Sequence, residues 1–244
     1  MAELIDSYTV SPAIVELTGP GSMTGLVTIA NDTEITYRMQ VNCVFFPPEK
    51  LFLGERLTTE ITIVEDISDL VVLSPRIMKL SPVSRRSLRF SVKSDPRFSQ
   101  PGEFRANLVF TPVVEFNNSP DQTQLGSVVT SIDWVVEMRV PIYLAIGKRA
   151  EAQLEITGKI AGTEDEPELN LVAVNTTSWR YPAQFEVSDR NGELIKIRRV
   201  FLRQTKKDFS VPLPRLPSGT ITIKWSSYLD YIPGTPGQLS IQPL

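Results

Sequence analysis

The sequence contains no histidine and only one cysteine, Cys43. The scarcity of these two residue types excludes several classes of catalytic and metal-binding site. Histidine is the commonest general base and metal ligand, so serine and cysteine hydrolase triads lose their central residue. Cys43 has no second cysteine for an internal disulfide and no partner at zinc spacing. A glycine-rich phosphate loop is also missing. We therefore expect no bound cofactor and no metal.

Long apolar runs and a basic charge balance are missing as well. No run approaches the roughly 20 residues that span a bilayer, so we expect no membrane insertion. The net charge of -3 gives no field for nucleic acid, and the basic residues between Arg198 and Lys207 are typical of a solvated face. The amino terminus MAELIDSYTV lacks the basic start and apolar core of a signal sequence. We expect either a cytoplasmic protein or one whose signal has been removed.

Paired carboxylates are present but do not predict an enzyme. Glu164, Asp165, Glu166 and Glu168 fall in a Gly-Thr-Pro setting that is typical of an exposed loop. No pair of acids can be placed at either separation that a glycosidase requires. We therefore expect a protein without enzymatic activity.

Short segments with alternating apolar residues recur along the chain, separated by proline, glycine and asparagine turn signals, and they predict strands. Residues 65–75, EDISDLVVLSP, are the exception and predict a helical turn. Arg190-Asn191-Gly192 has the Asn-Gly pattern of a tight hairpin. Each half holds about seven predicted strands, the pattern of a Greek-key sandwich. We expect an all-β protein of two β-sandwich domains, residues 1–147 and 148–244.

The segment from Ser131 to Ile146, SIDWVVEMRVPIYLAI, has an apolar residue at every even position. A strand that only completes its own sheet is usually about 5 or 6 residues long. This strand therefore has more apolar face than one sandwich needs.

Three segments together are similar to the PapD-like periplasmic pilus chaperones, and the similarity covers nearly the whole chain. The first is SPAIVEL followed by GLVTIANDTEITYRMQVNCV, and the third is the long strand together with SGTITIKWSSYLDY. The second, LSPVSRRSLRFSVKSDPRFSQPGEFRANLVFTPV, is the most specific, because it contains a Gly-Glu-Phe-Arg strand start at residues 102–105.

The resemblance implies two immunoglobulin-like domains set at an angle and a non-enzymatic chaperone of the periplasm, with its signal peptide removed. Such chaperones bind pilus or fimbrial subunits, which lack one strand, and deliver them to an outer-membrane usher in the chaperone-usher pathway. They act by donor strand complementation, in which the chaperone's long strand pairs with the subunit's open edge and fills its groove. Subunits and usher are thus the expected partners in fimbrium biogenesis.

The positions within the long strand predict which side chains would bind a subunit. Ile132, Trp134, Val136 and Met138 are expected to enter the subunit's pockets. Val140, Ile142 and Leu144 are expected to stay in the chaperone's own core.

Two charged features of the family are altered in this chain. Classical members hold the subunit's terminal carboxylate with an arginine on the first edge strand and a lysine on the donor strand. Here the first position is Pro12-Ala13 and the second falls near Pro141, which leaves Arg139 as the nearest cation. Arg139 is either the anchor or a surface cation paired with Glu137. The Ser-Pro start and the Arg-Val-Pro of the long strand resemble the divergent branch called archaic or alternative chaperones.

The family also has a charged network that holds the angle between its domains. Glu103 and Asp230 match its acidic positions, and Lys148 or Arg149 would replace its arginine. Buried pairs of this type often specify geometry more than they stabilise. We expect these four residues to be structural.

Two alternatives remain. The chain is either a chaperone or a structural or adhesive protein of the same two-sandwich fold, and the missing edge-strand cation favours the latter. Self-association is a further hypothesis, because a free chaperone has an apolar strand to cover.

Overall fold

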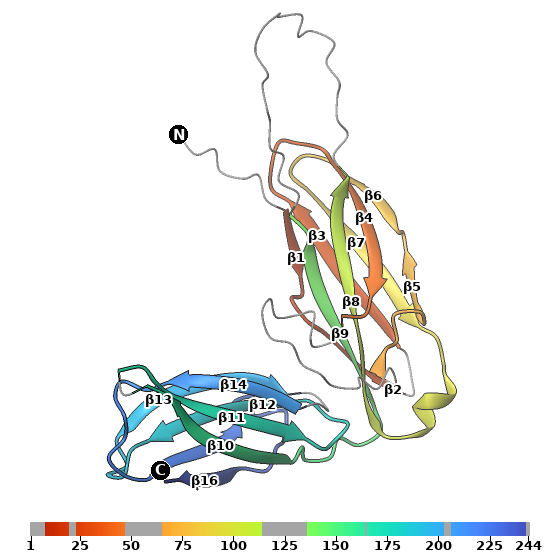
Figure 1. Ribbon diagram of the computed structural model, residues 1–244. Helices are drawn as coiled ribbons and strands as arrows, with labels where there is room; N and C mark the ends of the chain where they lie inside the picture. The colour runs from red at the N-terminus through yellow and green to blue at the C-terminus, as the bar shows by residue number, and fades with distance from the viewer. Residues whose placement is uncertain are drawn as a thin grey trace, which may run out of the picture. The chain divides into compact units, whose positions relative to one another are not determined.

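The computed structural model describes residues 8–19, 23–46, 65–113, 136–163, 165–202 and 206–242. These residues form sixteen strands and a short 3-10 helix, η3 (Pro96–Ser99), so the all-β prediction is confirmed (Figure 1). Among the described residues, no helix is long and apolar enough to cross a membrane. The chain divides into unit 1, which is Met1–Phe46, Val64–Ser99 and Phe104–Ala145, and unit 2, which is Pro47–Ile63, Gln100–Glu103 and Ile146–Leu244.

Unit 1 is a sandwich of a four-stranded sheet, in the order β1-β3-β7-β5, and a five-stranded sheet, in the order β2-β9-β8-β4-β6. Alternate side chains from both sheets face inward, and Ile29, Phe90, Val41, Leu108 and Ile142 are at most 1% exposed. The strands in the described residues are β1 (Tyr8–Ser11), β2 (Val15–Gly19), β3 (Thr24–Asn31), β4 (Tyr37–Val44), β5 (Val71–Ser74), β6 (Ile77–Leu80), β7 (Ser84–Val92), β8 (Gly102–Val113) and β9 (Met138–Ile146).

The first strand of unit 1 changes sheets, which sequence reasoning did not predict. The segment expected to be one strand near residue 13 is divided into β1, which pairs with β3, and β2, which neighbours β9 in the other sheet. Pro12 lies at the break, and proline has no N–H to continue a ladder. The short extended segments β1 and β2 thereby serve both sheets.

The helical turn predicted for residues 65–75 is limited to the first part of this segment. The backbone N–H of Leu70 donates to Ile67 O at 3.0 Å, which closes a tight turn. The rest of the window is β5, which pairs with β7 from Val71 to Ser74. Pairing in the sheet, with Val71 and Leu73 buried, outweighs the local helical preference of this short segment.

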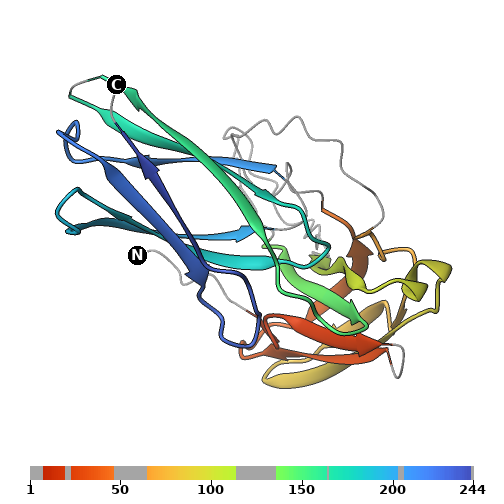
Figure 2. The same cartoon turned by 90° about the horizontal axis from the view of Figure 1, so that it is seen from below.

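Unit 2 consists of a three-stranded sheet, β10-β11-β14, and a four-stranded sheet, β13-β12-β15-β16. The last two strands lie side by side in dark blue in Figure 2. The predicted hairpin at residues 190–192 is present between β12 and β13, with Gly192 at a φ of 82°. The strands are β10 (Leu154–Gly162), β11 (Pro167–Asn175), β12 (Tyr181–Ser188), β13 (Leu194–Leu202), β14 (Lys206–Pro212), β15 (Ile221–Ser227) and β16 (Gly237–Ile241).

Both units contain the same buried asparagine device at the end of a strand. Asn31 ends β3, and its amide nitrogen donates to Ile35 O at 2.7 Å while its Oδ1 accepts from the N–H and hydroxyl of Thr33. Asn175 ends β11 and makes the same bonds to Trp179 O, at 2.7 Å, and to Thr177. Fully bonded buried amides hold a strand end in one geometry. The repeated pattern indicates that the two units are built on one plan.

Candidate functional site

The candidate site is the amino-terminal end of β9, where the apolar face of the strand passes from buried to exposed. Val140, Ile142 and Leu144 are at most 2% exposed, so their predicted place in the core of unit 1 is confirmed. Met138 is half-buried, and Val136, just before the strand, is 48% exposed. Side chains two apart share a face of a strand. One apolar face thus continues beyond the part that unit 1 covers.

Two of the residues predicted to bind a subunit, Ile132 and Trp134, lie outside the described residues. Their predicted role stays a prediction. Val136, Met138 and Arg139 are the members of the set that the structure describes. Val136 and Met138 share one face at the start of β9, whereas Arg139 lies on the opposite face.

Tyr8 fixes the backbone at this point, although sequence reasoning did not single it out. Its hydroxyl lies 2.7 Å from Val136 O and 3.1 Å from Phe110 O, and its one proton is shared between these two main-chain carbonyls. The ring is 4% exposed, and desolvation by burial raises the pKa of Tyr8 to about 12. The first strand therefore holds the start of β9 next to β8 through its backbone, and leaves the Val136 side chain outward.

The opposite face of β9 carries charge. Arg139 Nε donates to Glu137 Oε1 at 2.8 Å, and the guanidinium lies over the ring of Phe46 at 4.1 Å. The hydroxyl of Thr111 lies 3.4 Å from the other oxygen of Glu137. The two terminal amino groups of Arg139 make no hydrogen bond to any described residue. Arg139 is thus paired with Glu137 through Nε, and its two terminal amino groups could bind a second carboxylate.

The break between β1 and β2 supplies no cation. Ser11, Pro12, Ala13 and Ile14 are all exposed, and none is charged. Ile14 is 45% exposed and was not predicted as a site residue. Any anchoring charge among the described residues of this region therefore comes from β9.

The four residues predicted to be structural do not form one network. Arg149 Nη2 donates to Glu103 Oε2, and both residues belong to unit 2. Arg180, which the sequence did not reveal, lies 3.6 Å from the same oxygen and is 3% exposed. Asp230 and Lys148 are exposed and make no hydrogen bond or ion pair with any described residue. Their predicted role between domains stays a prediction.

The described residues contain no group of three or more histidine, cysteine, aspartate or glutamate side chains that could hold an ion. The start of β9 has an exposed apolar side chain, Val136, and an arginine, Arg139, whose terminal amino groups make no hydrogen bond to a described residue. These features are suited to contact with another polypeptide.

No protein-family model and no curated protein sequence matches the chain. Solved structures do. The E. coli chaperone DraB is 14% identical with a TM-score of 0.51, and the match covers 98% of this chain and 97% of that chain. SafB of Salmonella enterica, solved in complex with SafA pilin, is 11% identical with a TM-score of 0.52 over 98% and 99% of the two chains.

A third similar structure is CsuC of Acinetobacter baumannii, solved with the tip adhesion subunit CsuE as a pre-assembly complex of archaic chaperone-usher Csu pili. It is 10% identical with a TM-score of 0.52, again over 98% of this chain and 99% of that chain. All three are chaperones, the last two were solved with a pilin and with a pilus tip subunit, and each match spans both units. The resemblance predicted from the sequence is therefore confirmed at the level of structure: the chain has the two-domain fold of the pilus chaperones.

Proposed function

We propose that the protein is a periplasmic assembly chaperone that binds pilus or pilus-like subunits by strand donation from residues 132–138 and delivers them to an outer-membrane usher. One observation carries the proposal. The even-numbered face of β9 is buried at Val140 and 48% exposed at Val136, so an apolar ribbon leaves the sandwich that it belongs to.

Strand donation matches this geometry physically. An incomplete sandwich has an open groove and an unpaired edge, and a lent strand satisfies the edge with main-chain bonds while alternate side chains fill the groove. Burying an apolar side chain contributes about 1.5 to 3 kcal/mol. Ile132, Trp134, Val136 and Met138 together would contribute on the order of 6 to 12 kcal/mol before ordering costs.

Arg139 is the cation that would anchor a subunit's terminal carboxylate. Its Nε is occupied by Glu137, so a carboxylate would be held by the remaining Nη edge. No nucleotide is needed, because the subunit gains further folding energy when a neighbouring subunit's strand replaces that of the chaperone.

The test is co-expression with candidate subunits, followed by affinity co-purification of wild type and Val136→Asp. We expect the variant to recover at least tenfold less subunit, because a carboxylate cannot be desolvated in an apolar groove. Val72→Asp is the matched control, since Val72 is 41% exposed on β5. Subunit capture by Val136→Asp equal to that of the control would show that this strand is not the donor.

A second candidate is a structural or adhesive protein with the same fold. It is favoured by the pairing of Arg139 with Glu137 and by the uncharged break at Pro12 and Ala13, which together weaken the anchor. Neighbouring genes that encode an usher and small subunits with an incomplete β-sandwich would support the chaperone. Their absence would support the second candidate.

A further inference from the structure

The guanidinium of Arg139 is held both at one edge and on one face. Its Nε donates to Glu137 Oε1 at 2.8 Å. Its central carbon lies 4.1 Å from the ring centroid of Phe46, within the distance of about 6 Å at which an aromatic face attracts a cation. The two terminal amino groups of Arg139 make no hydrogen bond to a described residue. The orientation of the guanidinium is therefore set before a partner binds.

A further contact ties this ion pair to the neighbouring strand. The hydroxyl of Thr111, on β8, lies 3.4 Å from Oε2 of Glu137. Glu137 and Arg139 are two residues apart in extended chain, so they share the face opposite to that of Val136 and Met138. The start of β9 thus has apolar side chains on one face and this ion pair on the other.

The pair is electrically neutral, although Arg139 keeps two terminal amino groups for a partner. The side chains of Arg139 and Glu137 are 45% and 36% exposed, so solvent screens their attraction. A carboxylate that binds the terminal amino groups becomes the second anion around one cation, and like charges at close range repel each other. Arg139 should therefore bind a carboxylate more weakly than an arginine without an acidic neighbour.

Two other arginines, Arg105 and Arg149, also combine a carboxylate with an aromatic ring. Their side chains are only 5% and 19% exposed, against 45% for Arg139. Of these three oriented arginines, Arg139 is the one that a partner can reach most easily.

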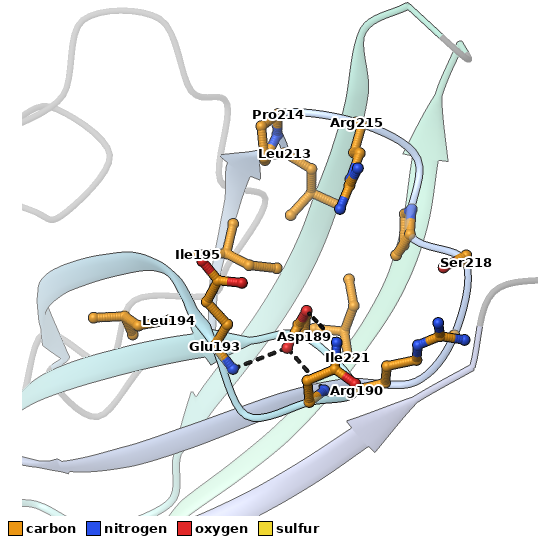
Figure 3. A pocket seen from close by; sticks show the side chains of 13 residues that line it. Asp189, Arg190, Glu193, Leu194, Ile195, Leu213, Pro214, Arg215, Ser218 and Ile221 are labelled. Atoms are coloured by element: carbon orange, nitrogen blue, oxygen red, sulfur yellow. Dashed lines mark hydrogen bonds between the residues drawn. The ribbon is translucent and has the colours of Figure 1, made fainter.

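The exposed arginines of unit 2 provide two comparisons. Arg190 and Arg215 line a cavity of about 420 Å³ (Figure 3) and make no hydrogen bond, ion pair or ring contact with any described residue. Arg199 instead lies 5.4 Å from the ring centroid of Tyr228, and its Nε donates to Gln184 Oε1 at 2.8 Å. A glutamine can therefore orient an arginine beside a ring without adding a charge.

We propose that Glu137 positions Arg139 for the terminal carboxylate of a subunit and, through its own charge, limits how tightly that carboxylate is bound. This role rests on the proposed function, in which a subunit is first captured and later released to a neighbouring subunit. Capture then depends mainly on the apolar side chains of the donated strand, and the carboxylate fixes the register of the pairing. Release does not have to break a strong ion pair.

The simpler explanation is that Glu137 and Arg139 form an exposed ion pair without a function, since most such pairs contribute little. It does not account for the stacking on Phe46 or for the two open amino groups beside the exposed Val136. The two explanations differ in a measurable way, because replacement of a pair without a function leaves carboxylate binding unchanged.

The test uses the full chain and two acetylated seven-residue peptides of alternating valine and threonine, one with a free terminal carboxylate and one with a terminal amide. NMR titration of the backbone amides at residues 136–140 gives a dissociation constant for each peptide. The ratio of the amide constant to the carboxylate constant isolates the effect of the carboxylate. We expect a ratio of about three for wild type and about one for Arg139→Gln. A wild-type ratio of one would overturn the anchor.

Glu137→Gln should raise this ratio at least a further threefold, because glutamine keeps an acceptor for Nε and removes the competing charge. Glu137→Ala also removes the acceptor, so its ratio should be lower than that of Glu137→Gln. An unchanged ratio in Glu137→Gln would overturn the limiting role of the charge. Equal ratios in the two variants would overturn the positioning role.

Two matched controls test for an effect of net charge alone. Arg199→Gln removes the charge of another exposed arginine with a bonded Nε, and Glu34→Gln removes the charge of an exposed glutamate between β3 and β4. Both should give the wild-type ratio. If they shift it as Arg139→Gln and Glu137→Gln do, the peptides respond only to net charge and the proposed role is wrong.

Val136→Asp distinguishes a failure of this role from a failure of the proposed function. It should bind the amide peptide at least tenfold more weakly than wild type. If it does so while Glu137→Gln keeps the wild-type ratio, strand donation stands and the role of Glu137 is wrong. If Val136→Asp binds the amide peptide as wild type does, or wild type binds neither peptide, donation from this strand is wrong and the role of Glu137 fails with it.

Discussion

The last strands of the two units, β9 and β16, have the same place in the chain order of their sandwiches but differ in how far their neighbours cover them. β16 has five residues, and each pairs with a residue of β15. β9 has nine residues, lies between β2 and β8, and continues an apolar face into the exposed Val136. In unit 2 the last strand ends where its sheet ends, whereas in unit 1 it extends beyond. Under the proposed function, the last strand of unit 1 is the one that would pair with a partner.

The rest of the two sandwiches is closely matched. Asn31 and Asn175 make equivalent bonds, and Tyr8 and Tyr181 each donate a hydroxyl proton to a main-chain carbonyl. Because the two units share these buried hydrogen bonds, the difference in exposure between β9 and β16 cannot be attributed to a different type of β-sandwich. Under the proposed function, it reflects the binding role of β9.

The largest expected effect contrasts two positions on the same face of β9. Ile142→Asp places a carboxylate where the wild-type side chain is fully buried, so unit 1 should lose about 4 kcal/mol or more. Val136→Asp should change stability by less than about 0.5 kcal/mol. Denaturant unfolding with hydrogen exchange, resolved by unit, measures both. Equal destabilisation would mean that Val136 is enclosed.

The paired asparagines come next. Asn31→Ala and Asn175→Ala each leave buried carbonyl and N–H groups without partners, so each should cost about 2 to 3 kcal/mol in its own unit. Asn170→Ala is the control, because this half-buried side chain makes no hydrogen bond to a described residue. A cost in one unit only would break the match between the two sandwiches.

Tyr8→Phe removes the hydroxyl that holds Val136 O, and should cost about 1 kcal/mol. Backbone amides at the start of β9 should then exchange faster, while those of β16 are unchanged. Tyr181→Phe, which removes the bond to Thr235 O, is the reciprocal variant and should affect unit 2 alone. Unchanged exchange at residues 136–139 in Tyr8→Phe would mean that β9 is held by other contacts.

The last prediction concerns pH. Burial raises the pKa of both Tyr8 and Tyr181 from 10.0 to about 12, because it disfavours the phenolate. A folded-state pKa above the unfolded one gives stability that is complete below pH 10 and is lost as the pH rises toward 12. Burial also raises the pKa of Tyr228. Absorbance titration should detect Tyr8, Tyr181 and Tyr228 as late tyrosines, and Tyr8→Phe should remove one of these transitions. An early, unshifted titration of any of the three would contradict its burial.

Much of the fold follows from alternation, since a period of two places Val140, Ile142 and Leu144 inward wherever the sheet lies. The seven strands of unit 2 and the hairpin at Gly192 were predicted for the same local reasons. The division of the first strand into β1 and β2 was not, because which sheet a short segment joins is decided by partners distant in sequence.

The site was predictable in part. The apolar face of β9 was readable, but Tyr8 and Arg180 act through contacts with residues far away in the chain, which no local pattern encodes. The Asn-x-Thr pattern at Asn31 and Asn175 was a signal that could have revealed the buried amides, since the side chains of residues two apart can bond across a turn.

The Tyr8 hydroxyl binds the main-chain carbonyl of Val136, a group that every residue has, and not the Val136 side chain. Substitution at Val136 leaves that attachment in place. The outward residues at this end of the strand can therefore diverge between related proteins without destabilising unit 1. Under the proposed function, recognition of new partners could then evolve at little cost to folding.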